Sequence, residues 1–268
     1  IKGWVNEFDI DGLRLDVAYC LNHDFLRRLR SFCDSLKPDF FLLGETLHGD
    51  YNQIMNDEML HSVTNYECYK GLYSSFNCMN MFEINHSLLR QFGPENWTLY
   101  KGKHLLSFVD NHDVTRVASI LNNANHLPLI YTLAFGMPGI PCVYYGSEWG
   151  ATGRKEDGDP ALRVSFDTPV WNDLTTFISK LAVAKKSSNA LNYGSFSSIV
   201  LTNEQCIFLR QYNDERVLVA INTSEQPYFA SFNIGTDTCT DLISGSEIKL
   251  NNGMELPGYS SFILQPFS

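Results

Sequence analysis

Three short stretches that end in acidic residues constrain the fold of this chain most strongly. The stretch 11–16 alternates leucines with Arg14 and Asp16, so an extended strand puts the two charged side chains on one face. The stretches 40–45 and 105–113 are apolar runs that end in carboxylates, as expected of strands buried on both faces. Parallel strands that each deliver a carboxylate at the C-terminal end are typical of the catalytic face of an α/β barrel.

The rest of the sequence predicts further helices and strands and then an all-β part. Apolar periodicity predicts helices and short strands at 24–36, 62–66, 67–92 with a break near 77–80, 127–136, 140–146 and 173–186. Beyond these, alternating runs between turn residues predict antiparallel strands at 198–201, 206–212, 216–221 and 228–232. We therefore expect two domains: residues 1–188, which hold the parallel strands, and a C-terminal β-sandwich domain of residues 189–268.

Composition excludes several classes of protein. The 268 residues are 44% hydrophobic, enough for a large core, and a net charge of −10 argues against a nucleic-acid partner, which needs a basic face. No stretch is long and apolar enough to cross a membrane, and no signal peptide is visible. The seven cysteines cannot all pair and lack zinc-ligand spacing, so we expect reduced thiols in a cytoplasmic protein.

Three motifs resemble signature regions of the α-amylase superfamily of glycoside hydrolases, in that family's order. They are Gly12-Leu13-Arg14-Leu15-Asp16-Val17-Ala18, Gly44-Glu45 and Phe108-Val109-Asp110-Asn111-His112-Asp113. The resemblance implies a (β/α)8 TIM barrel, of which this chain supplies the fourth to eighth strands, followed by an all-β antiparallel domain. Because the fourth strand comes almost at once, we expect the C-terminal portion of a longer enzyme, without the first three strands or the signature that carries Asn and His.

The resemblance implies a role for each of three carboxylates in a retaining glycosidase. Asp16 is expected to be the nucleophile, Glu45 the general acid and base, and Asp113 the carboxylate that stabilises the oxocarbenium-like transition state. Arg14, expected among the substrate-binding groups, shares a strand face with Asp16 and favours the ionised form that a nucleophile needs. Three carboxylates at one end of a barrel repel each other, so their convergence favours a functional site over a structural one.

Four further residues are implied to bind the sugar. His112 resembles the family's substrate-binding histidine, and the Asp159-x-x-x-Arg163 spacing resembles a pair that holds the sugar on the non-reducing side of the cleaved bond. His48 matches a pattern of neopullulanases, cyclomaltodextrinases and maltodextrin glucosidase-like enzymes. That pattern usually has Trp just before the histidine, where this chain has Leu47.

The sequence therefore predicts a retaining hydrolase of α-glucosidic linkages in maltodextrins or related α-glucans, without a cofactor or metal. A transglycosylase or isomerase of the same family uses the same residues, and a non-catalytic carbohydrate-binding relative shares the fold. A metal-dependent barrel enzyme is a third alternative, because Asp16, Glu45, His48, His112 and Asp113 carry groups that ligate divalent ions. The expected partners are an oligosaccharide and either the missing N-terminal part or a second copy of the chain. Alone, the chain is expected to have little activity.

Overall fold

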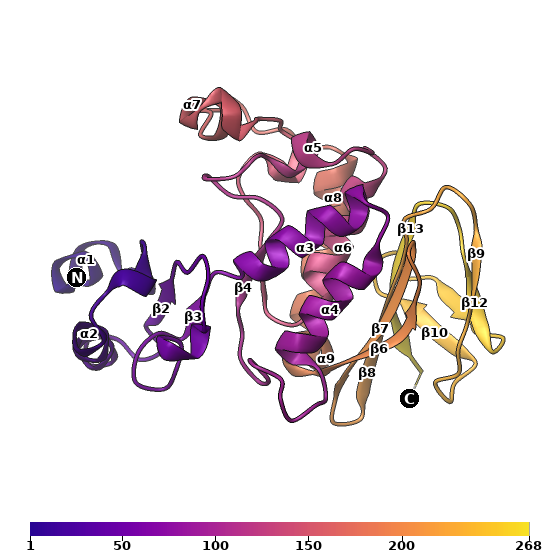
Figure 1. Ribbon diagram of the computed structural model, residues 1–268, viewed down its shortest axis with the longest axis horizontal. Coiled ribbons are helices and arrows are strands. Elements are labelled where there is room, and N and C mark those ends of the chain that lie inside the picture. The colour runs from indigo at the N-terminus through magenta and orange to yellow at the C-terminus, as the bar shows by residue number, and fades with distance from the viewer. Residues whose placement is uncertain (268) are drawn as a thin grey trace.

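The chain, described for residues 1–267 by a computed structural model, divides into a part with short parallel strands and a part with antiparallel strands (Figure 1). The parallel strands are β1 (Gly12–Leu15), β2 (Phe41–Gly44), β3 (Ser62–Val63), β4 (Leu106–Phe108) and β5 (Ile140–Cys142). β1 pairs with β2, β2 with β3, and β4 with β5, and a parallel bridge between Thr64 and Leu106 joins the two groups. Among the described residues, β1 pairs with β2 alone and β5 with β4 alone, so this barrel sheet is open.

Helices connect and flank these strands. They are α1 (Lys2–Phe8), α2 (His23–Leu36), α3 (Tyr66–Asn77), α4 (Met81–Phe92), α5 (Val117–Ile120), α6 (His126–Gly136), α7 (Asp159–Leu162), α8 (Asp173–Ser187) and α9 (Asn189–Tyr193). The side chain of Asn22 begins α2 by accepting hydrogen bonds from the backbone N–H groups of Asp24 and Phe25. A capping box between Asn172 and Thr175 begins α8 in the same way.

The predicted elements of this part are confirmed, with differences at their ends. The predicted strand 140–146 ends at Cys142, because the chain turns at Gly146, where φ is +86°. The segment 146–167 contains α7 and two short 3₁₀ helices. Helix α1 was not predicted, although its Trp4, Val5 and Phe8 recur at helical spacing; it buries none of its residues.

The C-terminal strands form a six-stranded antiparallel sheet and a smaller two-stranded sheet. In chain order the strands are β6 (Ser195–Leu201), β7 (Gln205–Tyr212), β8 (Glu215–Asn222), β9 (Tyr228–Ser231), β10 (Thr238–Asp241), β11 (Glu247–Lys249), β12 (Gly253–Leu256) and β13 (Ser260–Pro266). The order in the large sheet is β11-β10-β13-β8-β7-β6, and β9 pairs with β12. Leu218 and Leu264 of the large sheet share a core with Ala230 and Leu256 of the small one. The boundary at residue 188 stays a prediction; residues 189–193 are helical and strands begin at Ser195.

Helix α6 lies between the parallel strands and the large antiparallel sheet (Figure 1). Nine of its eleven residues are buried, as expected of a helix that is apolar all round. A Cβ atom added at Gly136 would lie 2.7 Å from a methyl group of Val219 on β8, so the glycine permits this close approach. The guanidinium of Arg210 on β7 donates a 2.8 Å hydrogen bond to the Gly136 carbonyl, which ends α6. The two parts of the chain therefore share one core.

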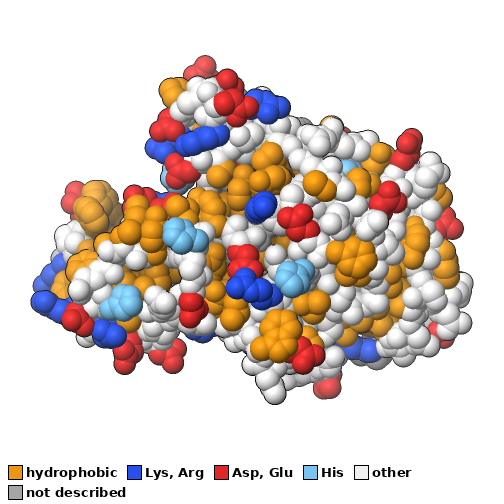
Figure 2. Space-filling view, viewed as in Figure 1, with side chains coloured by type: hydrophobic (Ala, Val, Ile, Leu, Met, Phe, Trp, Pro, Cys, Tyr) orange, Lys and Arg blue, Asp and Glu red, His pale blue; other side chains and the backbone are white. Residues whose placement is uncertain are grey.

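Large apolar side chains are exposed on the part that carries β1 and β2. Trp4 and Phe8 of α1 are 54% and 63% exposed, and Phe25 and Phe32 of α2 are also exposed. Phe25 and Phe32 are seven residues apart and so lie on one face of their helix, beside the buried stripe of Leu26, Leu29 and Cys33. Figure 2 shows apolar side chains gathered on this part of the surface, at the left. α1 directly precedes β1, the strand that pairs with β2 alone among the described residues.

Candidate active site

The C-terminal ends of β1 and β2 bring Arg14, Asp16 and Glu45 together. The Arg14 guanidinium forms an ion pair with Asp16 and, through its other terminal nitrogen, a 3.0 Å ion pair with Glu45. Glu45 is only 7% exposed and also accepts a 3.0 Å hydrogen bond from the backbone N–H of Val17. The Asp16 side chain is 72% exposed. One guanidinium thus holds a buried and an exposed carboxylate in the same small space.

The backbone immediately after Asp16 is held in an uncommon conformation. Val17 has φ of 47° and ψ of 43°, in the left-handed region that a β-branched residue rarely adopts. Two bonds hold it there, from Val17 N–H to the Glu45 carboxylate and from Ala18 N–H to the Glu45 carbonyl. Such strained residues cluster at active sites, where the surrounding structure maintains them. The turn fixes the position of Asp16 relative to Glu45.

The loop after β4 forms a second charged cluster. Asp113 accepts from the Arg163 guanidinium at 3.0 Å, and its other oxygen lies 3.0 Å from Nε2 of His112. The side chain of Asn111 accepts a 2.8 Å hydrogen bond from the backbone N–H of Asp113, and donates one of 2.9 Å to the hydroxyl of Tyr66. The loop is therefore shaped so that a histidine and an arginine face the same carboxylate.

One cavity of about 280 Å³ borders both clusters. The residues that line it come from all five parallel strands or the loops after them: Arg14, Leu43, Glu45, Thr64, Tyr66, Leu106, Phe108, Asp110, Asn111, His112, Cys142, Val143 and Tyr144. Apolar side chains, among them Leu43, Leu106 and Phe108, line it together with the charged groups of Arg14 and Glu45. The cavity thus joins Arg14 and Glu45 on one side to His112 on the other.

Tyr66 lies between the two clusters and was not identified from the sequence. Burial raises the pKa of its hydroxyl, and the nearby carboxylates of Glu45 and Asp113 raise it further, while the hydrogen bond from Asn111 acts in the opposite sense. The phenol is therefore protonated at neutral pH, and its O–H is a donor beside the cavity. A tyrosine in the first turn of a helix belongs to no recognisable sequence motif. Tyr66 can therefore be assigned to the site only from the position of α3 beside β4 in the structure.

Of the other predicted sugar-binding residues, Asp159 lies beside the cluster around Asp113 and His48 lies apart from it. Asp159 lies 3.8 Å from Arg163, so this pair joins the cluster around Asp113. His48 is exposed, with its ring 5.3 Å from that of Tyr19, and lines a separate hollow of about 600 Å³ that also contains Glu67. Of the predicted site residues, Arg14, Glu45 and His112 line the cavity that contains Glu45, and ion pairs join Asp16 to Arg14, Asp113 to His112 and Arg163, and Asp159 to Arg163. The site residues therefore form two clusters at one cavity, with His48 outside it.

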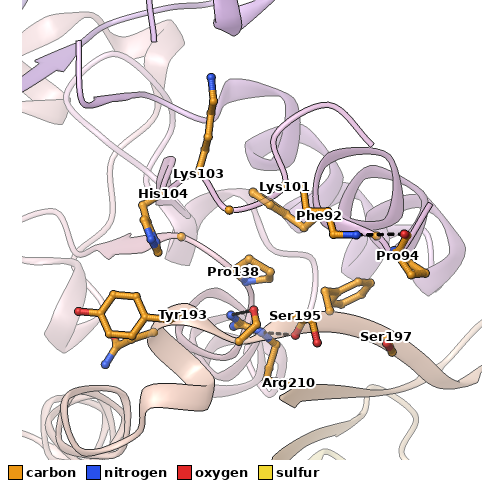
Figure 3. A pocket seen from close by; sticks show the side chains of 16 residues that line it. Phe92, Pro94, Lys101, Lys103, His104, Pro138, Tyr193, Ser195, Ser197 and Arg210 are labelled. Carbon is orange, nitrogen blue, oxygen red and sulfur yellow. Dashed lines mark hydrogen bonds between the residues drawn. The ribbon is translucent and has the colours of Figure 1, made fainter. Parts of the chain in front are cut away.

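A third hollow, of about 460 Å³, lies between the loop before β4 and the segment that joins α9 to β6 (Figure 3). His104, Tyr193 and Arg210 line it, and none of its described lining residues is acidic. Burial, together with the positive charges of Lys185 and Arg210, lowers the pKa of His104. Because this hollow offers no carboxylate, it does not provide the acid and base that glycoside cleavage requires.

Neither a metal centre nor a membrane-spanning helix is found in the part of the chain that the structure describes. Within residues 1–267, no group of three or more His, Cys, Asp and Glu side chains is arranged to hold a metal ion. The five residues of the metal-dependent alternative are thus not gathered into a metal site. No helix of these residues is long and apolar enough to span a membrane. The seven cysteines are all unpaired within the same residues.

Comparison with known proteins identifies the family. A family model for the alpha amylase catalytic domain matches residues 1–195, and one for the maltogenic amylase C-terminal domain matches residues 200–263. A cyclomaltodextrinase of Thermoanaerobacter pseudethanolicus is 27% identical over 98% of this chain and 46% of its own length. A maltogenic alpha-amylase of Bacillus acidopullulyticus is 30% identical over 94% of this chain and 44% of its own. The chain thus spans about half the length of the curated relatives it matches.

The fold agrees with solved structures. The crystal structure of an alpha-amylase from Geobacillus thermoleovorans, complexed with acarbose, superimposes on the whole chain with a TM-score of 0.85 at 22% identity, over 62% of its own length. This likeness confirms the fold that the sequence predicts, strands of a TIM barrel followed by an antiparallel β part. Because the catalytic-domain model covers well over half of its residues, the chain belongs to the alpha-amylase family.

Proposed function

We propose that this chain carries the catalytic carboxylates of a retaining glycoside hydrolase that cleaves α-glucosidic linkages in maltodextrins or related α-glucans. In this proposal Asp16 is the nucleophile, Glu45 is the general acid and base, and Asp113 stabilises the charge that develops on the sugar. Arg14, His112, Asp159 and Arg163 bind the substrate, and His48 contributes from the separate hollow that it lines. Relatives named cyclomaltodextrinase and maltogenic alpha-amylase support this substrate class.

One observation carries the proposal: a single guanidinium, that of Arg14, bridges Asp16 and Glu45 at the ends of adjacent strands. Retaining glycosidases need two carboxyl groups roughly 5–5.5 Å apart, with no room for a water molecule between them. Two carboxylates that contact the same guanidinium must lie close together, which supports the short separation that this mechanism requires.

The chemistry follows from the environments of the two carboxyl groups. The exposed oxygens of Asp16 attack the anomeric carbon while Glu45, held in place by Val17 N–H and Arg14, gives its proton to the leaving oxygen. Glu45 then takes a proton from the water that releases the sugar from Asp16. Asp113, with His112 and Arg163 against it, adjoins the same cavity through His112, which lines it. It acts as a negative group beside the oxocarbenium-like sugar.

The sheet of parallel strands is open at β1 and at β5 among residues 1–267. Closing a barrel requires every strand to have two neighbours, and among the described residues β1 and β5 have one each. We infer that the chain works within a longer polypeptide that supplies three further strands, or beside such a segment. The exposed Trp4, Phe8 and Phe25 are the surface that these strands and their helices would cover. The unpaired cysteines support a reducing, cytoplasmic location.

The test is the stereochemistry of the first product released by the longer polypeptide from maltotriose or a cyclodextrin. NMR should detect the α-anomer before mutarotation, and Asp16→Asn should abolish turnover while the folding transition is kept. Asp214→Asn, at an exposed turn of the antiparallel part, is the matched control and should leave turnover unchanged. An initial β-anomer, or normal turnover by Asp16→Asn, contradicts the proposal.

A further inference from the structure

Arg116 is completely buried, and its hydrogen bonds reach three separate segments of the chain. One terminal nitrogen donates to the carbonyl of Tyr145 at 2.8 Å and to the hydroxyl of Ser147 at 3.1 Å. The other donates to the carbonyl of Leu162 at 3.0 Å. The backbone N–H of Arg116 donates to the carbonyl of Gly153 at 2.9 Å. The loops after β4 and β5 and helix α7 therefore meet at this one side chain.

Aromatic rings cover the guanidinium. Its central carbon lies 4.6 Å from the ring centre of Tyr144, 5.3 Å from that of Tyr145 and 5.8 Å from that of Phe166. The Tyr144 hydroxyl donates in turn to the Leu162 carbonyl at 3.1 Å, so this ring is fixed at both ends. A desolvated cation over aromatic faces is held in both position and orientation. The rings thus prevent Arg116 from exchanging its three acceptors for water.

Asp110 supplies the opposite charge through a hydroxyl. Ser147 donates a 2.7 Å hydrogen bond to the Asp110 carboxylate and accepts one from Arg116. The same carboxylate oxygen accepts from the backbone N–H of Val117 at 2.7 Å, which closes the loop that begins at Asp110. Residues 111–116, which include His112 and Asp113, are therefore pinned at both ends by buried polar groups.

Each segment that Arg116 holds carries a group of the proposed sugar site. The loop after β4 carries Asp113, the loop after β5 carries Tyr144 on the cavity wall, and α7 is followed by Arg163, the neighbour of Leu162. We propose that Arg116 is a positioning residue that sets Arg163 and Tyr144 relative to Asp113. This inference rests on the proposed function for its catalytic consequence, while its structural part stands on the contacts alone.

Lysine cannot replace this arginine. The acceptors lie on different sides of a planar group, and a single ammonium at the end of a flexible stem cannot reach the Tyr145 and Leu162 carbonyls while it stacks on Tyr144. Arg116→Lys keeps the positive charge but loses the planar guanidinium and its several N–H donors. Arg210→Lys is the matched control, because Arg210 is equally buried and also donates to three backbone carbonyls, those of Gly136, Gly194 and Ser195, far from the proposed site.

The first experiment measures amide hydrogen exchange by mass spectrometry on the chain itself. Arg116→Lys should accelerate exchange together in residues 111–116, 144–153 and 159–164, and Arg210→Lys should accelerate it in 136–139 and 190–197 instead. Should Arg116→Lys not fold, Ser147→Ala replaces it, because it removes the link to Asp110 and keeps both charges. Unchanged exchange in the three segments, or a change confined to one of them, overturns the proposal.

The second experiment measures kcat and KM on maltotriose in the longer polypeptide, at a temperature where each variant is fully folded. Arg116→Lys should lower kcat/KM roughly 100-fold, the cost of misplacing binding groups by about 1 Å, while Arg210→Lys keeps kcat/KM within about twofold of the parent. Equal losses in both variants indicate a merely structural role and overturn the positioning claim. If the parent itself has no glycosidase activity, the proposed function fails, and the exchange result still decides whether Arg116 couples the three segments.

Discussion

Replacing Glu45 by glutamine separates the structural part of its role from the chemical part. Its carboxylate accepts from two donors, the backbone N–H of Val17 and the Arg14 guanidinium, each at 3.0 Å. Glutamine has one acceptor oxygen, so its NH2 group must face one of these donors. Losing one buried hydrogen bond of this kind costs about 1–3 kcal/mol, so the Glu45→Gln enzyme should fold with a lower free energy of unfolding.

The catalytic loss should depend on the leaving group. Without a general acid, cleavage of maltotriose should slow by about 100- to 10,000-fold, or about 3–5 kcal/mol of activation free energy. Departure of fluoride from α-maltosyl fluoride needs no proton, so the first step on that substrate should be nearly as fast as in the parent. Azide should then restore turnover and give α-maltosyl azide, because an anionic nucleophile needs no general base.

The assay compares kcat/KM for maltotriose and α-maltosyl fluoride in parent, Glu45→Gln and the control Glu255→Gln, whose side chain is exposed on β12. Urea unfolding of each variant measures the stability cost separately. An equal loss on both substrates, with no rescue by azide, would refute the assignment of Glu45 as general acid. It would instead place Glu45 among the groups that only hold Arg14.

Further predictions concern the buried groups and the open sheet. Burial raises the pKa of Asp110 to about 6, so the folded chain binds more protons than the unfolded chain between about pH 4 and 6. The free energy of unfolding should therefore fall by up to roughly 3 kcal/mol as pH rises through that window, and urea titrations of Asp110→Asn should lack this decrease. Gly136→Ala should destabilise the chain by about 1–3 kcal/mol, because the new methyl overlaps Val219, and a double-mutant cycle with Val219→Ala should show less than the summed cost. A stabilised Gly136→Ala would show that the helix end shifts freely. Finally, the chain expressed alone should release little reducing sugar from maltodextrin and should associate in light scattering; monomeric, active chain would show that the open edge is harmless.

Local sequence patterns were enough to predict most elements of the α/β part. The apolar residues of α2 and its cap, Asn22, are close together in the sequence. The helix can therefore be predicted without knowledge of contacts to distant residues. Similarly, Arg14 and Asp16 contact each other as the two-residue strand period predicts. Helix α1 was missed although Trp4, Val5 and Phe8 recur at helical spacing, and the predicted strand beginning at Ile140 was too long because the chain turns at Gly146.

The sequence by itself determined the family and the fold and predicted the three carboxylates, because short motifs at strand ends keep their residue types and their order. Only the tertiary structure decided which of these groups meet. It placed Arg14 between Asp16 and Glu45, left His48 outside the cavity, and brought Tyr66 and Arg116 to the site. Tyr66 precedes its hydrogen-bond partner Asn111 by 45 residues, and Arg116 precedes Leu162 by 46. Contacts over such separations arise from the packing of parallel strands and their loops, which no local pattern records.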